Sequence, residues 1–185
     1  MDILEKLFGS ASRVKILRLF LLNAESIFDA GDVSVKSKVN PAEARREIAL
    51  LKKAGVLADK SFFKEIPPRK GSKHPSTKKR VAGFQLKAGF PLLSPLKNLI
   101  ISETPLNREG IVRRLRSVGK VKLLVLSGIF LEESESRVDV LIVGDGLNKR
   151  AIDHALRSIE AEIGKELSYG AFETVEFLYR VSVYD

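Results

Sequence analysis

Residues 127–145, SGIFLEESESRVDVLIVGD, are the part of the chain whose residue types come nearest to an active site. They predict a strand, a turn and a second strand that starts at Asp139, with Arg137 two positions earlier. Residues two apart on a strand share a face, so carboxylates at both positions could hold the metal ions of a phosphoryl-transfer enzyme. Arg137 instead places a fixed positive charge there. We therefore expect Asp139 to be structural, held either by Arg137 or by backbone N–H groups.

Other residue types that carry chemistry are scarce. The chain has no cysteine and two histidines, which argues against thiolate metal sites, zinc clusters and catalytic triads. The sequence therefore predicts no metal and no cofactor. The segment GDGLNK (144–149) has two glycines after a strand, but Lys149 stands where a dinucleotide-binding turn has its third glycine. An ordinary strand-to-helix turn is expected there.

The charge is unevenly distributed along the 185 residues. The net charge is +9, and residues 1–100 carry 20 Lys and Arg against 9 Asp and Glu, whereas residues 101–185 carry 12 against 14. This asymmetry indicates that the first half of the chain meets a polyanion. A solvated basic surface without a partner is the alternative.

The elements of the first half are three helices and a hairpin. GSASRVKILRLFLLN and SIFDAGDVSVKSKVN predict two helices, and Ser10 is a plausible N-cap of the first. NPAEARREIALLKKAG predicts the third, with the cap Asn40, Pro41 in the first turn and Gly55 at the end. Its apolar stripe is Ala44, Ile48 and Leu51. VLADKSFFKEI and KRVAGFQLK then predict a hairpin with a basic, Gly- and Pro-containing tip.

This order, over about residues 5–88, resembles a winged helix-turn-helix domain. The resemblance implies that the third helix enters the major groove of double-stranded DNA, where Arg45 and Arg46 could reach base edges, and that the hairpin contacts phosphates. The alternatives are a solvated helix face with Glu–Arg pairing, a disordered basic loop, or an RNA or protein partner. The residues expected at the DNA are Ala42, Arg45, Arg46, Ala49, Lys52 and Lys53 on the helix, and Arg69, Lys70, Lys73, His74, Lys78, Lys79 and Arg80 on the hairpin.

The second half predicts two connecting helices and then strands, a helix, a third strand and a last helix. VKLLVLSGIF, SRVDVLIVGD and GKELSYGAFETVEFLYRV, within residues 120–183, resemble the minimal nucleotidyltransferase fold of the polymerase-beta superfamily. The resemblance implies a vestigial site at Gly128, Arg137 and Asp139. Gly128 keeps the turn glycine, but Ile129 replaces the serine of the motif and Arg137 replaces its first aspartate. We expect this site to be inactive.

Together these features predict an α+β protein in three parts. They are a winged helix-turn-helix domain (1–88), a helical linker (89–119) and a small α/β nucleotidyltransferase-like domain with a short mixed sheet (120–185). The expected function is DNA-binding transcriptional regulation in the cytoplasm, with no membrane segment and no enzymatic activity. The last domain would serve for dimerisation, ligand sensing or docking of a nucleotide or protein partner. A homodimer is expected, with this domain and the leucine-rich segment 91–101 as the apolar surfaces available for pairing. The alternatives are an active nucleotidyltransferase and an RNA-binding accessory protein.

Overall fold

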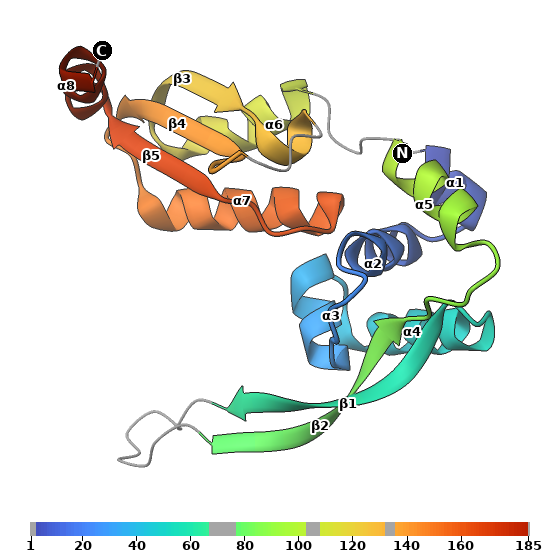
Figure 1. Cartoon of the computed structure of the whole chain (residues 1–185). Helices are drawn as coiled ribbons and strands as arrows, with labels where there is room; N and C mark the ends of the chain where they lie inside the picture. Colours follow the sequence, from blue (N-terminus) through green and yellow to red (C-terminus); the bar gives the residue numbers. More distant parts are fainter. Residues whose placement is uncertain (1–2, 67–76, 103–107, 132–135, 185) are drawn as a thin grey trace. The chain divides into compact units, whose positions relative to one another are not determined.

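The computed structural model describes the chain except for residues 1–2, 67–76, 103–107, 132–135 and 185 (Figure 1). The α+β class is confirmed: helices precede a two-stranded hairpin, and a three-stranded mixed sheet with helices follows. The chain divides into two compact units, Met1–Glu103 (unit 1) and Thr104–Asp185 (unit 2). This division falls inside the range 89–119 that the sequence predicts as a helical linker. Within the described residues, no helix has the length and apolar character needed to cross a membrane.

The described residues of unit 1 form five helices and one hairpin. Their bounds are α1 Ile3–Phe8, α2 Ala11–Leu22, α3 Ala30–Ser37, α4 Pro41–Lys53, β1 Leu57–Ile66, β2 Thr77–Leu86 and α5 Leu93–Ser102. The caps explain where the helices start. The side chains of Ser10 and Asn40 accept backbone N–H groups at the starts of α2 and α4, and Asp29 and Asp32 form a capping box on α3. Helix α4 ends just before Gly55, which has a φ of +79°.

Helix α2 is the centre of unit 1. It contacts α1, α3, α4, α5 and β2, so its side chains are buried on almost every side. Phe20 is fully buried and meets Phe28 edge-to-face, with ring centroids 5.6 Å apart. Burial of a side chain of this size contributes about 1.5–3 kcal/mol. Helical spacing places Arg18 between the apolar residues of α2. Arg18 is nevertheless buried as well.

The hairpin is attached to the helices at its base. Strands β1 and β2 pair in continuous antiparallel register from Leu57↔Leu86 to Ile66↔Thr77. Phe28, just before α3, adds a bridge to Phe84 of β2 through two backbone hydrogen bonds of 3.1 and 2.8 Å. In Figure 1, α3 and α4 lie between α2 and the hairpin, and the strands extend past α3. The base is therefore fixed, while the outermost pairs project beyond the helices.

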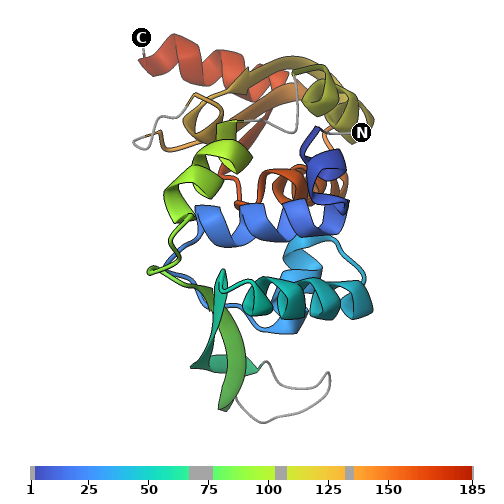
Figure 2. The ribbon, with the colours of Figure 1, turned by 90° about the vertical axis from the view of Figure 1, so that its right-hand side faces the viewer.

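Unit 2 is a three-stranded sheet with helices on it. Its elements are α6 Arg108–Leu115, the 3-10 turn η1 Arg116–Val118, β3 Lys120–Leu126, the 3-10 turn η2 Gly128–Phe130, β4 Val140–Asp145, α7 Lys149–Ile163, β5 Tyr169–Glu173 and α8 Thr174–Tyr184. The strand order is β3-β4-β5, antiparallel between β3 and β4 and parallel between β4 and β5. Helix α7 lies on one side of the sheet and α8 on the other (Figure 2). Asp139 directly precedes β4 and is not its first residue.

Candidate nucleic-acid interface

The outer side of α4 carries the arginines singled out in the sequence. Arg45 and Arg46 are exposed, as are Ala42, Ala49 and Lys53. Neither arginine has an ion-pair partner among the described residues. Glu47 of the same helix is buried and pairs with Arg13 instead. The Glu–Arg pairing considered as an alternative therefore does not involve Arg45 or Arg46 in the described part of the chain, and both guanidinium groups are available to an anionic ligand.

Lys52 lies differently from its neighbours on α4. Its Nζ is 2.7 Å from Oδ1 of Asp59 in β1 and 5.5 Å from the ring centroid of Phe84 in β2. The side chain is half-buried and joins α4 to the hairpin. Lys52 thus sets the position of the hairpin relative to α4, and it offers less free charge to a ligand than Arg45 or Lys53.

The position of α4 against α2 depends on the buried carboxylate of Glu47. Its Oε1 accepts a hydrogen bond of 2.8 Å from Oγ of Ser10, and its Oε2 accepts one of 2.7 Å from Nε of Arg13. Ser10 also caps α2 through the backbone N–H of Arg13. One acidic side chain on α4 therefore binds the N-cap and one residue of the first turn of α2, which helps to fix the direction in which Arg45 and Arg46 project.

The hairpin presents a second group of cations. Lys78, Lys79 and Arg80 are exposed on β2, and the guanidinium of Arg80 donates two hydrogen bonds, of 3.0 and 2.7 Å, to Oγ of Ser61 across the strands. The tip residues Arg69, Lys70, Lys73 and His74 lie outside the described residues. The hairpin brings the charges of Lys78 to Arg80 together on one short segment of edge strand.

Two further residues of β1 have a role in the hairpin and were not singled out in the sequence. Phe63 is 72% exposed and lies opposite Arg80 in the register, so the two side chains leave the hairpin on the same face. The adjacent pair Phe62–Phe63 could have indicated this, because side chains alternate on a strand and one of the two rings must face away from the core. The second residue is Lys64, whose ammonium group contacts the start of α3.

Lys64 fastens the hairpin to α3. Its Nζ lies 2.7 Å from Oδ2 of Asp29 and 2.6 Å from Oδ1 of Asp32, the two residues of the capping box. Burial raises the pKa of Asp29, but the hydrogen bond from Lys64, the backbone N–H groups of Asp32 and Gly31 and the charge of Lys64 outweigh it, and the net pKa lies below the usual value. Hydrogen bonds to Asp29 and Asp32 raise the pKa of Lys64. The ammonium group therefore stays charged and links hairpin and helix.

In unit 2, the structure decides between the two expectations for Asp139. Its Oδ1 accepts the backbone N–H of Ile129 at 2.9 Å and its Oδ2 accepts that of Ser168 at 2.8 Å. Its own backbone bonds Ser127 and Ser168. Arg137 is exposed and, in the part of the chain that the structure describes, forms no ion pair with Asp139. Backbone N–H groups, and not Arg137, hold this carboxylate.

Gly128 is required by the same arrangement. It has a φ of +56°, a left-handed conformation that favours glycine, and a Cβ atom built on it would collide with Oδ1 of Asp139. Gly128 and Asp139 thus lie together, and their contact closes the turn after β3 and links it to the start of β5. Both carboxylate oxygens are already used in this link.

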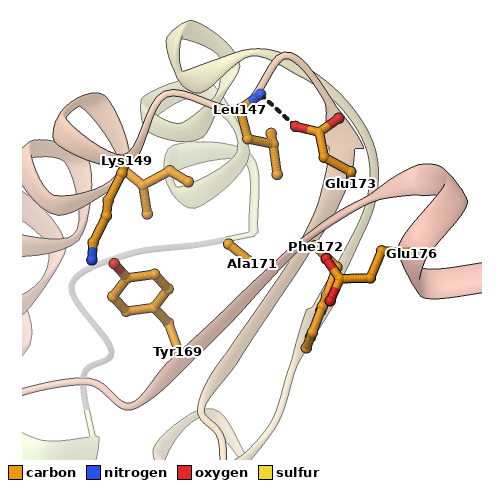
Figure 3. Close-up of a pocket in the computed structure, with 8 residues that line it drawn as sticks. Leu147, Lys149, Tyr169, Ala171, Phe172, Glu173 and Glu176 are labelled. Atoms are coloured by element: carbon orange, nitrogen blue, oxygen red, sulfur yellow. Dashed lines mark hydrogen bonds between the residues drawn. The ribbon is translucent and has the colours of Figure 1, made fainter. Parts of the chain in front are cut away.

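A pocket of about 430 Å³ lies at the opposite end of β4, between the start of α7, β5 and the start of α8 (Figure 3). The carboxylate of Glu173 accepts the backbone N–H groups of Gly146 and Leu147, each at 3.2 Å. These are the donors of the GDGLNK turn that a phosphate would need, so the turn binds a carboxylate of the chain itself. The hydrogen bond that Tyr169 donates to Asp153 raises the pKa of Tyr169.

Comparisons with known proteins add no family to this picture. No protein-family model matches the chain, and neither does any curated protein or solved structure. Among the residues that the structure describes, no group of three or more His, Asp or Glu side chains is arranged to hold a metal ion. The function of the chain must therefore be inferred from the contacts and charges of its own residues.

Proposed function

We propose that the protein is a DNA-binding transcriptional regulator in which unit 1 acts as a winged helix-turn-helix domain. The observation that carries the proposal is the exposed pair Arg45 and Arg46, which has no carboxylate partner among the described residues and stands on a helix held firmly against α2. Arginines on such a helix can pair bidentately with guanine in the major groove. In this proposal α4 is the recognition helix.

The hairpin supplies the wing of the same proposal. Lys78, Lys79 and Arg80 are exposed on β2, and Phe63 is exposed on the face of Lys78 and Arg80, a combination that suits contact with phosphates and with the wall of a minor groove. Lys52 and Lys64 attach the hairpin to α4 and α3, so the two contact surfaces keep a fixed relation. Phosphate contacts by the wing would provide affinity, and the arginines of α4 would provide sequence preference.

Unit 2 has a role without catalysis in this proposal. A nucleotidyltransferase would need carboxylate oxygens free to bind metal ions, and both oxygens of Asp139 accept backbone N–H groups. The exposed cation of Arg137 would further oppose a divalent ion. Pairing of chains, ligand sensing or partner docking remain as roles for unit 2.

The proposal is tested by selecting ligands from random duplex DNA and random RNA in parallel, with the full chain and at a stated salt concentration. We expect enrichment of a duplex DNA motif. Enrichment of RNA alone would replace the proposal with an RNA-binding function. A second assay incubates the protein with labelled nucleoside triphosphates, Mg²⁺ or Mn²⁺, and RNA or protein acceptors. Transfer that is lost in Asp139→Asn would establish an enzyme instead.

A further inference from the structure

Helix α8 is apolar on more sides than its neighbours cover. Val175, Leu178, Tyr179 and Val183 follow helical spacing and form one stripe, and they are 80%, 61%, 68% and 52% exposed. Phe177, on another side of α8, is half-buried. Glu176 and Arg180 form an ion pair between Phe177 and the stripe. An exposed apolar stripe of this kind, bordered by polar side chains, is typical of an interaction surface. The described residues of unit 2 leave it largely uncovered.

The sheet continues this apolar surface. The register places Leu123, Val143 and Phe172 in one row across the three strands, and Val125 and Leu141 in the next row of the same face. The guanidinium of Arg180 lies 5.0 Å from the ring centroid of Phe172, so α8 covers the β5 end of this face. Leu123 and Val125 on β3 stay about two-fifths exposed.

Together these six side chains form what we call the α8 surface: Leu123, Val125, Val175, Leu178, Tyr179 and Val183. Five of the six are Val or Leu, so the lower end of the range of about 150–250 Å² for aromatic side chains applies, and their exposed fractions correspond to roughly 500 Å². The largest apolar patch on a typical monomer is about 300–600 Å², and a standard interface buries about 800 Å² per partner. The α8 surface is therefore the size of a large monomer patch, a kind of surface that is often an interaction site, and polar side chains around it would complete the area of a dimer interface.

We propose that a second copy of the chain covers the α8 surface, with the two α8 helices antiparallel about a two-fold axis near Leu178. Glu176 and Arg180 lie two residues on either side of Leu178, so this crossing brings Glu176 of each copy to Arg180 of the other. Their side chains are 48% and 54% exposed and can reach across. The choice of a second copy rests on the proposed function, because paired helix-turn-helix domains read two half-sites.

The first test measures the mass of the full chain in solution at tens of micromolar by light scattering. We expect twice the 20.5 kDa of one chain for the wild type and the single mass for Leu178→Asp. Leu92→Asp is the matched control, since Leu92 is also 61% exposed but lies in unit 1. It should stay dimeric. Circular dichroism checks folding, and Val175→Asp replaces Leu178→Asp if the latter does not fold.

A second test uses the charges. Glu176→Arg and Arg180→Glu each place like charges opposite each other in a homodimer, so each variant alone should dissociate at least tenfold more readily. Mixed in equal amounts, with tags of different size, the two variants should form a heterodimer in preference to either homodimer. A heterodimer share no larger than about half of all dimers, as random mixing gives, would reject the antiparallel crossing.

A monomeric wild type would overturn the inference. So would a dimer that survives both Leu178→Asp and Val175→Asp, or a dimer that only Leu92→Asp dissociates. The last result would assign pairing to the segment 91–101. These outcomes are independent of DNA. A wild-type dimer that binds no DNA would overturn the proposed function and leave the α8 interface standing. A Leu178→Asp monomer should still bind one half-site but lose at least tenfold in affinity for a two-fold site.

Discussion

Nε of Arg13 in α2 donates a hydrogen bond of 2.7 Å to Oε2 of Glu47 in α4, and this contact fixes the helix that carries Arg45 and Arg46. Glu47 is 6% exposed, so its charge depends on Arg13 and Ser10 for compensation. A buried pair that loses one partner leaves an uncompensated group. The integrity of the candidate interface therefore depends on a residue that does not itself face the ligand.

Replacing Glu47 with alanine should lower the free energy of unfolding by about 3 kcal/mol, because Arg13 and Ser10 lose their acceptor inside the unit. Urea denaturation followed by circular dichroism measures this. Glu43→Ala is the control on the same helix, as Glu43 is exposed. It should cost less than about 1 kcal/mol. Equal costs for the two variants would show that the buried pair adds nothing to stability.

Arg45→Ala and Arg46→Ala should each weaken binding to the selected DNA site by about 1–3 kcal/mol and change binding to random duplexes little, because a bidentate contact to a base carries sequence information. Fluorescence anisotropy on both DNAs measures the difference. Arg157→Ala removes an exposed arginine from α7 and should have no effect. If both DNAs lose affinity equally, the arginines contact phosphates and not bases.

The double variant Lys78→Ala, Lys79→Ala should weaken binding to every duplex similarly. It should also reduce the slope of log K against log salt by about two units, since each phosphate contact contributes about 0.9. Titrations at several salt concentrations give the slope. A double variant of exposed lysines elsewhere, Lys97→Ala with Lys165→Ala, should keep the slope of the wild type. An unchanged slope in the hairpin variant would remove β2 from the interface.

Asp139→Ala should destabilise unit 2 by about 1–3 kcal/mol, because the N–H groups of Ile129 and Ser168 lose their acceptor. Asp139→Asn keeps one acceptor oxygen and should cost less. Arg137→Ala should change stability by less than about 0.5 kcal/mol, because Arg137 is exposed. Thermal unfolding ranks the three variants. A large cost for Arg137→Ala would mean that the arginine supports Asp139 after all.

The link between Lys64 and α3 should make stability depend on pH at both ends of the range. The lowered pKa of Asp29 means that its contribution is complete above the ordinary value of 3.8 and is lost as the pH falls through the lowered pKa. The raised pKa of Lys64 means that its contribution is complete below 10.5 and is lost as the pH rises through the raised pKa. Between these limits Lys64→Met should cost about 1 kcal/mol.

Urea denaturation of the wild type and of Lys64→Met across this pH range measures the difference. Asp29→Asn is the sharper control, because asparagine is an equally good N-cap but carries no charge to titrate. In the Asp29→Asn background, the stability difference caused by Lys64→Met should depend less on pH in the acidic range. The cap of α3 should stay intact. A difference between wild type and Lys64→Met that stays constant down to strongly acidic pH would separate Lys64 from Asp29.

The local elements could be predicted because their signals are local. Ser10 and Asn40 act as the caps that their residue types suggest, and the apolar stripe Ala44, Ile48 and Leu51 is buried. The partners of charged residues could not be predicted in this way. Glu47 meets Arg13 across 34 positions and Lys64 meets Asp29 across 35, so the pairing exists only once the helices and the hairpin have packed.

The neighbours of a residue across the hairpin also could not be predicted from the sequence. The alternation of β1 requires one of Phe62 and Phe63 to face outward, but only the pairing with β2 shows that Phe63 lies opposite Arg80. For Asp139, the sequence left Arg137 and the backbone as two possible partners. The left-handed turn at Gly128, which brings the N–H of Ile129 to the carboxylate, decides between them.

The unbroken register of β1 and β2 also determines how far unit 1 can reach. A strand rises by about 3.3 Å per residue, so two strands of ten residues form an arm of about 30 Å. Lys52 fastens this arm near its base and Lys64 farther along β1, which leaves the outermost pairs unsupported by the helices. One turn of duplex DNA measures about 34 Å. Such an arm is long enough to touch a backbone most of a helical turn away from the groove that α4 would occupy.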